Sequence, residues 1–223
     1  MADTRERLSA EERKAQILRC AAAVFARSSY RLAGMADIAK EAGISEPTVY
    51  KHFASKKDLF LNILDRVGES TLQHWEEILA SSDDPMIVMR QIGLSQYEIV
   101  STHPDTLKVQ FQALSEVEDE DIRRTLHRNF ASYIDFLAQI VQRGKELGRF
   151  SSDLDVRAAA WQLLSIGFTL NLTSLLGFEQ EFTRETLEVM GDNLVVTFGA
   201  AMGSSAAPAA KAEAPRKERV PRS

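Results

Sequence analysis

Cysteine is nearly absent from this chain of 223 residues, which holds one cysteine, six prolines and 11 glycines. A single thiol excludes a disulfide framework, a thiolate zinc site and an iron–sulfur cluster. The low proline and glycine content excludes collagen-like and low-complexity proteins. With 44% hydrophobic residues, the chain is long enough to bury a core in one or two domains.

Targeting and membrane signals are also missing. The first residues are charged and lack the apolar core of a signal peptide. Residues 158–178 carry no charge and are long enough to cross a membrane. However, Gln162, Ser165, Thr169 and Thr173 form a polar stripe there, and no Lys/Arg cluster flanks the run. We therefore expect no membrane span, a helix buried inside the protein or an oligomer, and a cytoplasmic protein.

Patterns that support catalysis are not found either. The four histidines lie on separate segments, and none forms the i, i+4 pair of a metal-binding helix. There is no glycine-rich phosphate loop and no nucleophile motif. The acidic run Glu118–Asp121 fits the first turn of a helix, where the dipole favours negative side chains, better than a cation site. We expect no enzyme activity, no metal and no cofactor.

Charge is distributed unevenly along the chain. Residues 1–58 have a net charge of +3, residues 59–203 of −11 and residues 204–223 of +3. A basic end joined to an acidic body predicts that the N-terminal part meets a polyanion. Residues 204–223 are rich in alanine and basic side chains and have almost no apolar bulk, so we expect a disordered tail.

Apolar residues recur at helical spacing almost throughout, with no convincing strand. Ser9 with Glu12, and Ser55 with Asp58, have the form of capping boxes at helix starts. Gly43 stands where a left-handed residue ends a helix. Nine helices are predicted, at about residues 9–28, 35–42, 45–52, 55–80, 85–102, 107–114, 118–147, 154–176 and 183–202.

Residues 38–53 read as helix, tight turn and helix, the helix-turn-helix arrangement whose second helix enters the major groove of DNA. Gly43 supplies the turn, and apolar residues such as Ile38 and Val49 form the small core between the two helices. The remaining side chains of the second helix point outward. The residues predicted to contact DNA are Ser45, Glu46, Pro47, Thr48, Tyr50, Lys51, His52 and Lys56.

Their chemistry suits this task. Lys51 can reach guanine acceptors, and Thr48 can meet a base edge or a thymine methyl group. Tyr50, His52 and Lys56 can bind phosphate oxygens and set the register. By this pattern alone, a helical hairpin with a solvated polar face is the alternative.

The N-terminal quarter of the chain, residues 11–62, resembles the tetracycline-repressor (TetR) family of bacterial regulators. The matching residues are Ile17-Leu18, Ala22, Phe25, Ile38-Ala39, Ala42-Gly43-Ile44-Ser45, Val49-Tyr50, His52-Phe53, Ser55-Lys56 and Leu59-Phe60. Two departures occur. Ser29-Tyr30 stands where the family often has Gly-Tyr, and Ala33-Gly34-Met35 stands where threonine often caps the second helix. Gly34 is a weaker cap and offers no hydroxyl to a phosphate.

The resemblance implies an all-α homodimer that reads a palindromic operator and holds an effector pocket in each C-terminal domain. Ligand binding would swing the fourth helix and release the DNA. The expected domains are a helix-turn-helix domain over 1–58, ordered from about residue 9, and a helical ligand-binding and dimerisation domain over 59–203. Such a protein would act in a bacterial cytoplasm, on the nucleoid when DNA-bound.

Within the C-terminal domain, two sets of residues are candidates for the pocket and the interface. For the pocket, aromatic and methionine side chains with few charges favour a mostly apolar or aromatic small molecule. The pocket candidates are Trp75, Met89, Tyr97, Phe111, Gln112, Phe130, Tyr133, Phe168 and Asn171. The dimer-interface candidates on the last two long helices are Trp161, Leu164, Leu172, Leu175, Leu187, Met190, Leu194 and Phe198.

The leading hypothesis is a ligand-responsive DNA-binding regulator, by family default a repressor. The first alternative is an activator or a ligand-independent regulator of the same family. The second is a helical ligand-binding or adaptor protein whose N-terminal helices do not read DNA.

Overall fold

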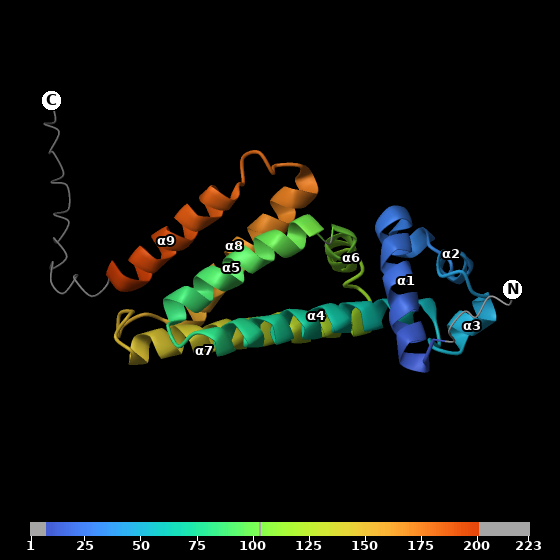
Figure 1. The fold of residues 1–223 in the computed structure, drawn as a ribbon, viewed down its shortest axis with the longest axis horizontal. Coiled ribbons are helices and arrows are strands. Elements are labelled where there is room, and N and C mark those ends of the chain that lie inside the picture. The colour runs from blue at the N-terminus through green and yellow to red at the C-terminus, as the bar shows by residue number, and fades with distance from the viewer. Residues whose placement is uncertain (1–7, 103, 201–223) are drawn as a thin grey trace, which may run out of the picture.

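The computed structural model describes residues 8–102 and 104–200, and all regular structure in these ranges is α-helical. This confirms the expected all-α class. A small N-terminal group of three helices stands at one end of a larger bundle (Figure 1). The predicted tail, 204–223, lies outside the described residues. The helices are α1 (Ala10–Leu32), α2 (Met35–Glu41), α3 (Glu46–Tyr50), α4 (Lys56–Ser81), α5 (Pro85–Thr102), α6 (Pro104–Leu114), α7 (Glu120–Glu146), α8 (Val156–Leu176) and α9 (Arg184–Ala200).

Local sequence signals set most helix ends. Ser9 and Glu12 form the predicted reciprocal capping box at the start of α1. Ser55 caps α4 by accepting from the amide of Asp58, whereas the Asp58 carboxylate reaches past Ser55 to the amide of Ala54. In this second predicted capping box, the side chain of Asp58 therefore accepts from the amide of Ala54 and not from that of Ser55.

The end of α1 contains a kink at Ser29. This serine has φ 65° and ψ 157°, a region that glycine occupies without strain and other residues rarely adopt. The predicted helix end near residue 28 corresponds to this break, after which the chain continues helically to Leu32. Ala33 then donates its amide to the carbonyl of Ser29.

The N-terminal helices share a core with the start of α4. Ile17, Phe25, Ile38 and Val49 are each 0% exposed, and the same cluster extends to α4. The α4 members of that cluster are Leu59, Phe60, Ile63 and Leu64. The predicted boundary after residue 58 thus falls within one continuous core, and the first turns of α4 belong structurally to the N-terminal unit.

The long helices α4 and α7 lie side by side and form the base of the bundle, α5 and α8 pack against this base, and α9 packs against α5 and α8 (Figure 1). Their core is aromatic: Trp75 lies against Tyr133 and Phe136, and Phe150 against Phe198. Because α4 belongs to both cores, it connects the two units mechanically.

Helix α8 is apolar but poorly covered by its own chain. Its length and mean hydropathy of 1.2 are compatible with a membrane span, and 17% of its most apolar window is buried within the chain. Of the two expected settings, burial inside the protein is therefore not seen within one chain, and burial inside an oligomer stays a prediction. The side chains left on the surface include Trp161, Phe168, Leu172 and Leu176.

Candidate nucleic-acid interface and internal cavity

The short helix α3 lies at the outer end of the N-terminal unit (Figure 1). Val49 anchors it to the core and is 0% exposed, whereas Tyr50 on the other side is 49% exposed. Of the other residues predicted to meet DNA, Ser45, Pro47 and Lys51 are exposed. Glu46, Thr48, His52 and Lys56 are half-buried. All eight surround α3 and the start of α4.

Ser45 takes the predicted N-cap position of α3, but its hydroxyl does not cap a backbone amide. The hydroxyl lies 2.7 Å from the hydroxyl of Thr48. This contact restrains the Thr48 side chain at the start of α3, where the helix would enter a groove first.

Lys56 is engaged within its own chain. Its Nζ donates to the carbonyls of Arg31 at 3.1 Å and Ala33 at 3.0 Å, and lies 4.9 Å from the ring centroid of Tyr30. An ammonium group has three N–H donors, so one further acceptor, such as a phosphate oxygen, is compatible with this geometry. Lys56 therefore fixes the corner between α1 and α2 to the start of α4.

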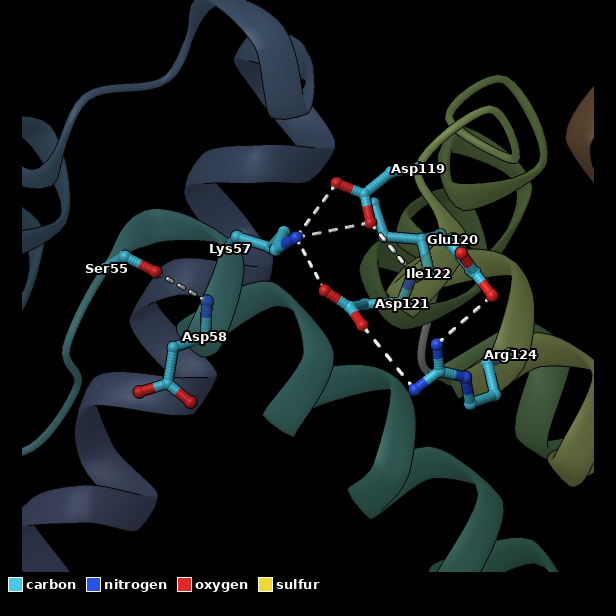
Figure 2. A network of polar contacts seen from close by, with 8 residues as sticks. All are labelled: Ser55, Lys57, Asp58, Asp119, Glu120, Asp121, Ile122 and Arg124. Carbon is cyan, nitrogen blue, oxygen red and sulfur yellow. Dashed lines mark hydrogen bonds and ion pairs between the residues drawn. The ribbon is translucent and has the colours of Figure 1, made fainter.

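A network of charges joins the start of α4 to the start of α7 (Figure 2). Lys57 Nζ lies 2.7 Å from Asp121 Oδ2 and 3.1 Å from Asp119 Oδ2. Asp119 also caps α7 by accepting from the amides of Asp121 and Ile122. The acidic run is thus the start of a helix, as its sequence predicts, and Lys57 holds it through contacts that the sequence did not predict.

These contacts change the protonation equilibria of the network. Hydrogen bonds from Lys57 and from backbone amides hold the pKa of Asp119 below its ordinary value. Hydrogen bonds to Asp121 and Asp119 raise the pKa of Lys57. Both groups are accordingly charged together across the neutral range.

Three further contacts tie the N-terminal unit to α6 and the segment that follows it. Gln112 Nε2 donates to the carbonyl of Phe25, and the amide of Tyr30 donates to Gln112 Oε1. Arg31 pairs with Glu116 at 2.7 Å. These contacts hold both sides of the kink in α1.

A cavity of about 330 Å³ lies inside the bundle, with walls from α4 to α9. Seven of the nine predicted pocket residues line it: Trp75, Met89, Phe111, Phe130, Tyr133, Phe168 and Asn171. Two are placed elsewhere. Gln112 faces α1, and Tyr97 packs into the apolar cluster of α5, α6, α8 and α9. Helical spacing indicates the face of a helix on which a residue lies, but not which neighbouring helix that face meets.

The cavity wall is mostly apolar, and several of its polar side chains have hydrogen-bond partners within the chain. Gln96 Nε2 donates to Asn171 Oδ1 at 2.9 Å, and Asn129 donates to the carbonyl of Leu64. Burial raises the pKa of the Tyr133 hydroxyl. The charged residues on the described wall are Arg90, Glu188 and Asp192, which pair at 3.3 and 3.5 Å.

The predicted interface residues divide into two groups. Trp161 and Leu172 are 56% and 38% exposed, and Leu175 and Met190 are half-buried. Leu187 and Phe198 are 5% and 0% exposed, so the chain's own core removes them from the interface. The cavity wall includes both of them together with Leu164 and Leu194.

The sequence analysis did not predict several residues that line the cavity or join α4 to α7. Lys57 carries no motif, and its partners lie more than sixty positions away. Gly93, Gly167 and Gly191 also line the cavity. These three glycines could have been singled out from the sequence, because a glycine inside a predicted helix usually has a packing or functional reason. Over the described residues, no group of three or more His, Cys, Asp or Glu side chains is placed to hold a metal ion.

Comparison with known proteins agrees with this geometry. Residues 17–63 match the model of the tetR family of bacterial regulatory proteins. The chain is 38% identical over 78 residues to the HTH-type transcriptional activator FasR of Mycolicibacterium smegmatis, covering 35% of this chain and 36% of FasR. It is 27% identical over 152 residues to the HTH-type transcriptional repressor KstR2 of Mycobacterium tuberculosis, covering 65% and 72% of the two chains.

The fold extends further than the sequence match. The structure of the transcriptional regulator FadR from Bacillus subtilis in complex with stearoyl-CoA aligns with a TM-score of 0.69. The alignment covers 82% of this chain and 97% of FadR at 18% identity. At that identity the likeness establishes the fold alone, over the aligned part of the chain.

Proposed function

We propose that this chain, which belongs to the TetR family of bacterial regulatory proteins, is a homodimeric transcriptional repressor that a small apolar molecule releases from DNA. The observation that carries this proposal is the position of α4. Its first turns lie in the core that holds α3, and Leu64 and Trp75 on the same helix line the cavity. A ligand that moves α4 therefore moves the helix that reads DNA.

The reading surface follows from the exposed side of α3. Lys51 provides a cation for guanine acceptors, and Thr48 meets a base edge or methyl group. Tyr50, His52 and Lys56 bind phosphates and set the register. Ser45, Glu46 and Pro47 form the start of the helix that enters the groove.

Dimerisation uses the outer faces of α8 and α9. Trp161, Leu176, Val189 and Val196 are 56%, 62%, 58% and 64% exposed. Large apolar patches of this kind on a soluble chain mark interaction surfaces. A twofold axis along these helices places two copies of α3 on successive major grooves of a palindrome.

The effector is a mostly apolar molecule that enters the cavity. The wall is dominated by aliphatic and aromatic side chains, and its guanidinium is already paired with carboxylates. The structure of FadR, which has the same fold, is a complex with stearoyl-CoA, and the apolar acyl chain of that molecule supports an effector with an apolar part. No cofactor or membrane takes part in this mechanism.

Activation is the second candidate, since FasR, the relative with 38% identity over the N-terminal region, is a transcriptional activator. An adaptor that does not read DNA is the remaining alternative.

The first experiment is selection of random duplex DNA by the purified protein at near-physiological salt, followed by sequencing. A palindrome with half-sites about one helical turn apart supports a dimeric reader. Absence of any motif contradicts it.

Addition of apolar ligands to the complex of the protein with its selected DNA then distinguishes a repressor from an activator or a ligand-independent regulator. A repressor with an inducer loses affinity for the operator in the presence of its ligand. Unchanged or increased affinity with a ligand that binds the cavity favours an activator or a ligand-independent regulator. Thr48→Ala and Lys51→Ala should each relax the preference at particular base positions. An adaptor that does not read DNA would show no such change.

A further inference from the structure

Three glycines lie within helices on the cavity wall: Gly93 in α5, Gly167 in α8 and Gly191 in α9. Glycine inside a helix is unfavourable relative to alanine because ordering its backbone costs more conformational entropy. None of the three has the positive φ angle that would require glycine. Backbone conformation therefore does not explain them.

Close packing does not explain them either. A Cβ atom added at any of the three would meet no atom within 4 Å. Gly68 and Gly144 behave differently: a Cβ at Gly68 would lie 2.6 Å from Cγ of Asn129, and one at Gly144 would collide with the ring of Phe150. In those two positions neighbouring side chains fill the space, whereas at the three cavity glycines the space is open.

Paired side chains place Gly93 and Gly191 opposite each other. Arg90, one turn before Gly93, pairs with Glu188 and Asp192 of α9. These two acids flank Gly191 on the same side of that helix, three residues before it and one after it. The ion pairs thus close the space between α5 and α9 on one side of the glycines.

A second contact places Gly167 at the same level. Gln96, one turn after Gly93, donates to Asn171, one turn after Gly167. Helix α5 is in contact with both α8 and α9. The space left by the three missing side chains therefore lies between two bridges, the ion pairs that join α5 to α9 and the hydrogen bond that joins α5 to α8.

We propose that Gly93, Gly167 and Gly191 form a slot that admits a straight, uncharged hydrocarbon segment of the effector. We call it the glycine slot. It deepens the proposed function, because it lies in the cavity assigned there to the effector. A methylene chain fits a narrow space between helices, whereas a fused-ring molecule needs more width. Arg90 is paired with Glu188 and Asp192, and Glu188 also pairs with Arg184, so the two guanidinium groups described beside the slot are already engaged with carboxylates.

The test uses two uncharged probes with the same number of carbon atoms, 1-decanol and 1-adamantanol. Their binding to the full-length protein is measured by isothermal titration calorimetry, and by tryptophan fluorescence, since Trp75 lies on the cavity wall. We expect the straight alcohol to bind more tightly than the cage-shaped one. Absence of decanol binding, or tighter binding of adamantanol, overturns the proposal.

Alanine variants locate the site. Gly93→Ala, Gly167→Ala and Gly191→Ala should each weaken decanol binding about tenfold, the effect of one misplaced methyl group in an apolar pocket. Their melting temperatures should stay the same or rise, because the methyl group enters open space and the helix gains propensity. Gly199→Ala is the matched control: it lies in α9, its Cβ meets Arg149 O at an ordinary 3.9 Å, and it is not on the wall. It should not change decanol affinity.

Other outcomes decide against the slot. Unchanged decanol affinity in all three variants overturns it, as does a fall in their melting temperatures. Monomeric alanine variants in sedimentation also overturn it, since the open space would then belong to a subunit contact. Failure of the wild-type protein to select any DNA motif is a separate result, which contradicts the proposed function and leaves decanol binding in the slot unaffected.

Discussion

Phe111 and Gln112 are neighbours in α6, but their side chains serve different parts of the molecule. Phe111 lines the cavity and stacks on Phe168 with ring centroids 5.4 Å apart. Gln112 accepts from the amide of Tyr30 and donates to the carbonyl of Phe25, both in α1. A displacement of Phe111 by a ligand therefore reaches the N-terminal unit through the adjacent residue.

Gln112→Met should uncouple the two units. Methionine keeps the length of the side chain but loses both hydrogen bonds, so we expect a loss of about 1–2 kcal/mol in the free energy of unfolding. Urea unfolding measures this loss. Under the proposed function, the same variant should also need more ligand to release DNA. Gln139→Met, at an exposed site on α7, is the control and should have little effect on either quantity.

Ser29→Gly should stabilise the protein. Serine at φ 65°, ψ 157° is strained, and glycine adopts this conformation freely. Relief of the strain is worth about 1 kcal/mol or more. Thermal and urea unfolding are the measurements. Ser28→Gly, one residue earlier and exposed, should instead destabilise the protein by about 0.5–1 kcal/mol. Equal effects of the two substitutions would contradict the strain at Ser29.

Lys57→Gln should make stability depend differently on pH. The pKa of Asp119 is lowered in the folded state, so its contribution is present above the ordinary value and is lost as pH falls through the folded value. The pKa of Lys57 is raised, so its contribution is present below the ordinary value and is lost as pH rises through the folded value. The difference in melting temperature between wild type and variant should therefore be largest near neutral pH and shrink on both sides.

Salt supplies a second check on this network. Because Lys57 and Asp119 are 40% and 34% exposed in their side chains, added salt should reduce the difference between wild type and variant. Lys108→Gln, at an exposed position of α6, is the comparison. A melting-temperature difference that is flat from acid to alkaline pH would show that the network does not couple α4 to α7.

Lys51→Ala and Lys56→Ala should have different effects on DNA binding. Loss of Lys51 should cost about 1–3 kcal/mol at particular base positions and relax the preference there. Loss of Lys56 should weaken binding to all sequences about equally and reduce the salt slope by about one unit. Affinities measured over a salt series, for the operator and for its single-base variants, distinguish the two. A uniform loss from Lys51→Ala would argue against base reading.

Lys56→Ala should also lower stability, which Lys51→Ala should not. The ammonium of Lys56 holds the carbonyls of Arg31 and Ala33 and lies over the ring of Tyr30. Lys51 is exposed at the end of α3. A lower melting temperature for Lys56→Ala with an unchanged salt slope would assign this lysine to the α1–α2 corner alone.

The order of the helices and the reading helix were predictable because their signals are local. Apolar periodicity marks each helix, and Ser9, Gly43 and Ser55 act within a few residues of their own position. The motif around α3 is equally local, since its turn, its core residues and its outward side chains lie within sixteen consecutive residues. Short-range geometry was sufficient for these features.

Only the folded chain could decide which face each C-terminal helix turns toward which neighbour. Phe198 and Trp161 both lie on apolar faces in the sequence, but one is fully buried and the other is 56% exposed. Gln112 and Lys57 find partners more than sixty positions away. The glycine slot exists because three helices converge there. Helical periodicity gives a direction relative to the helix axis, and the packing of several axes against one another determines whether that direction leads to core, cavity or surface.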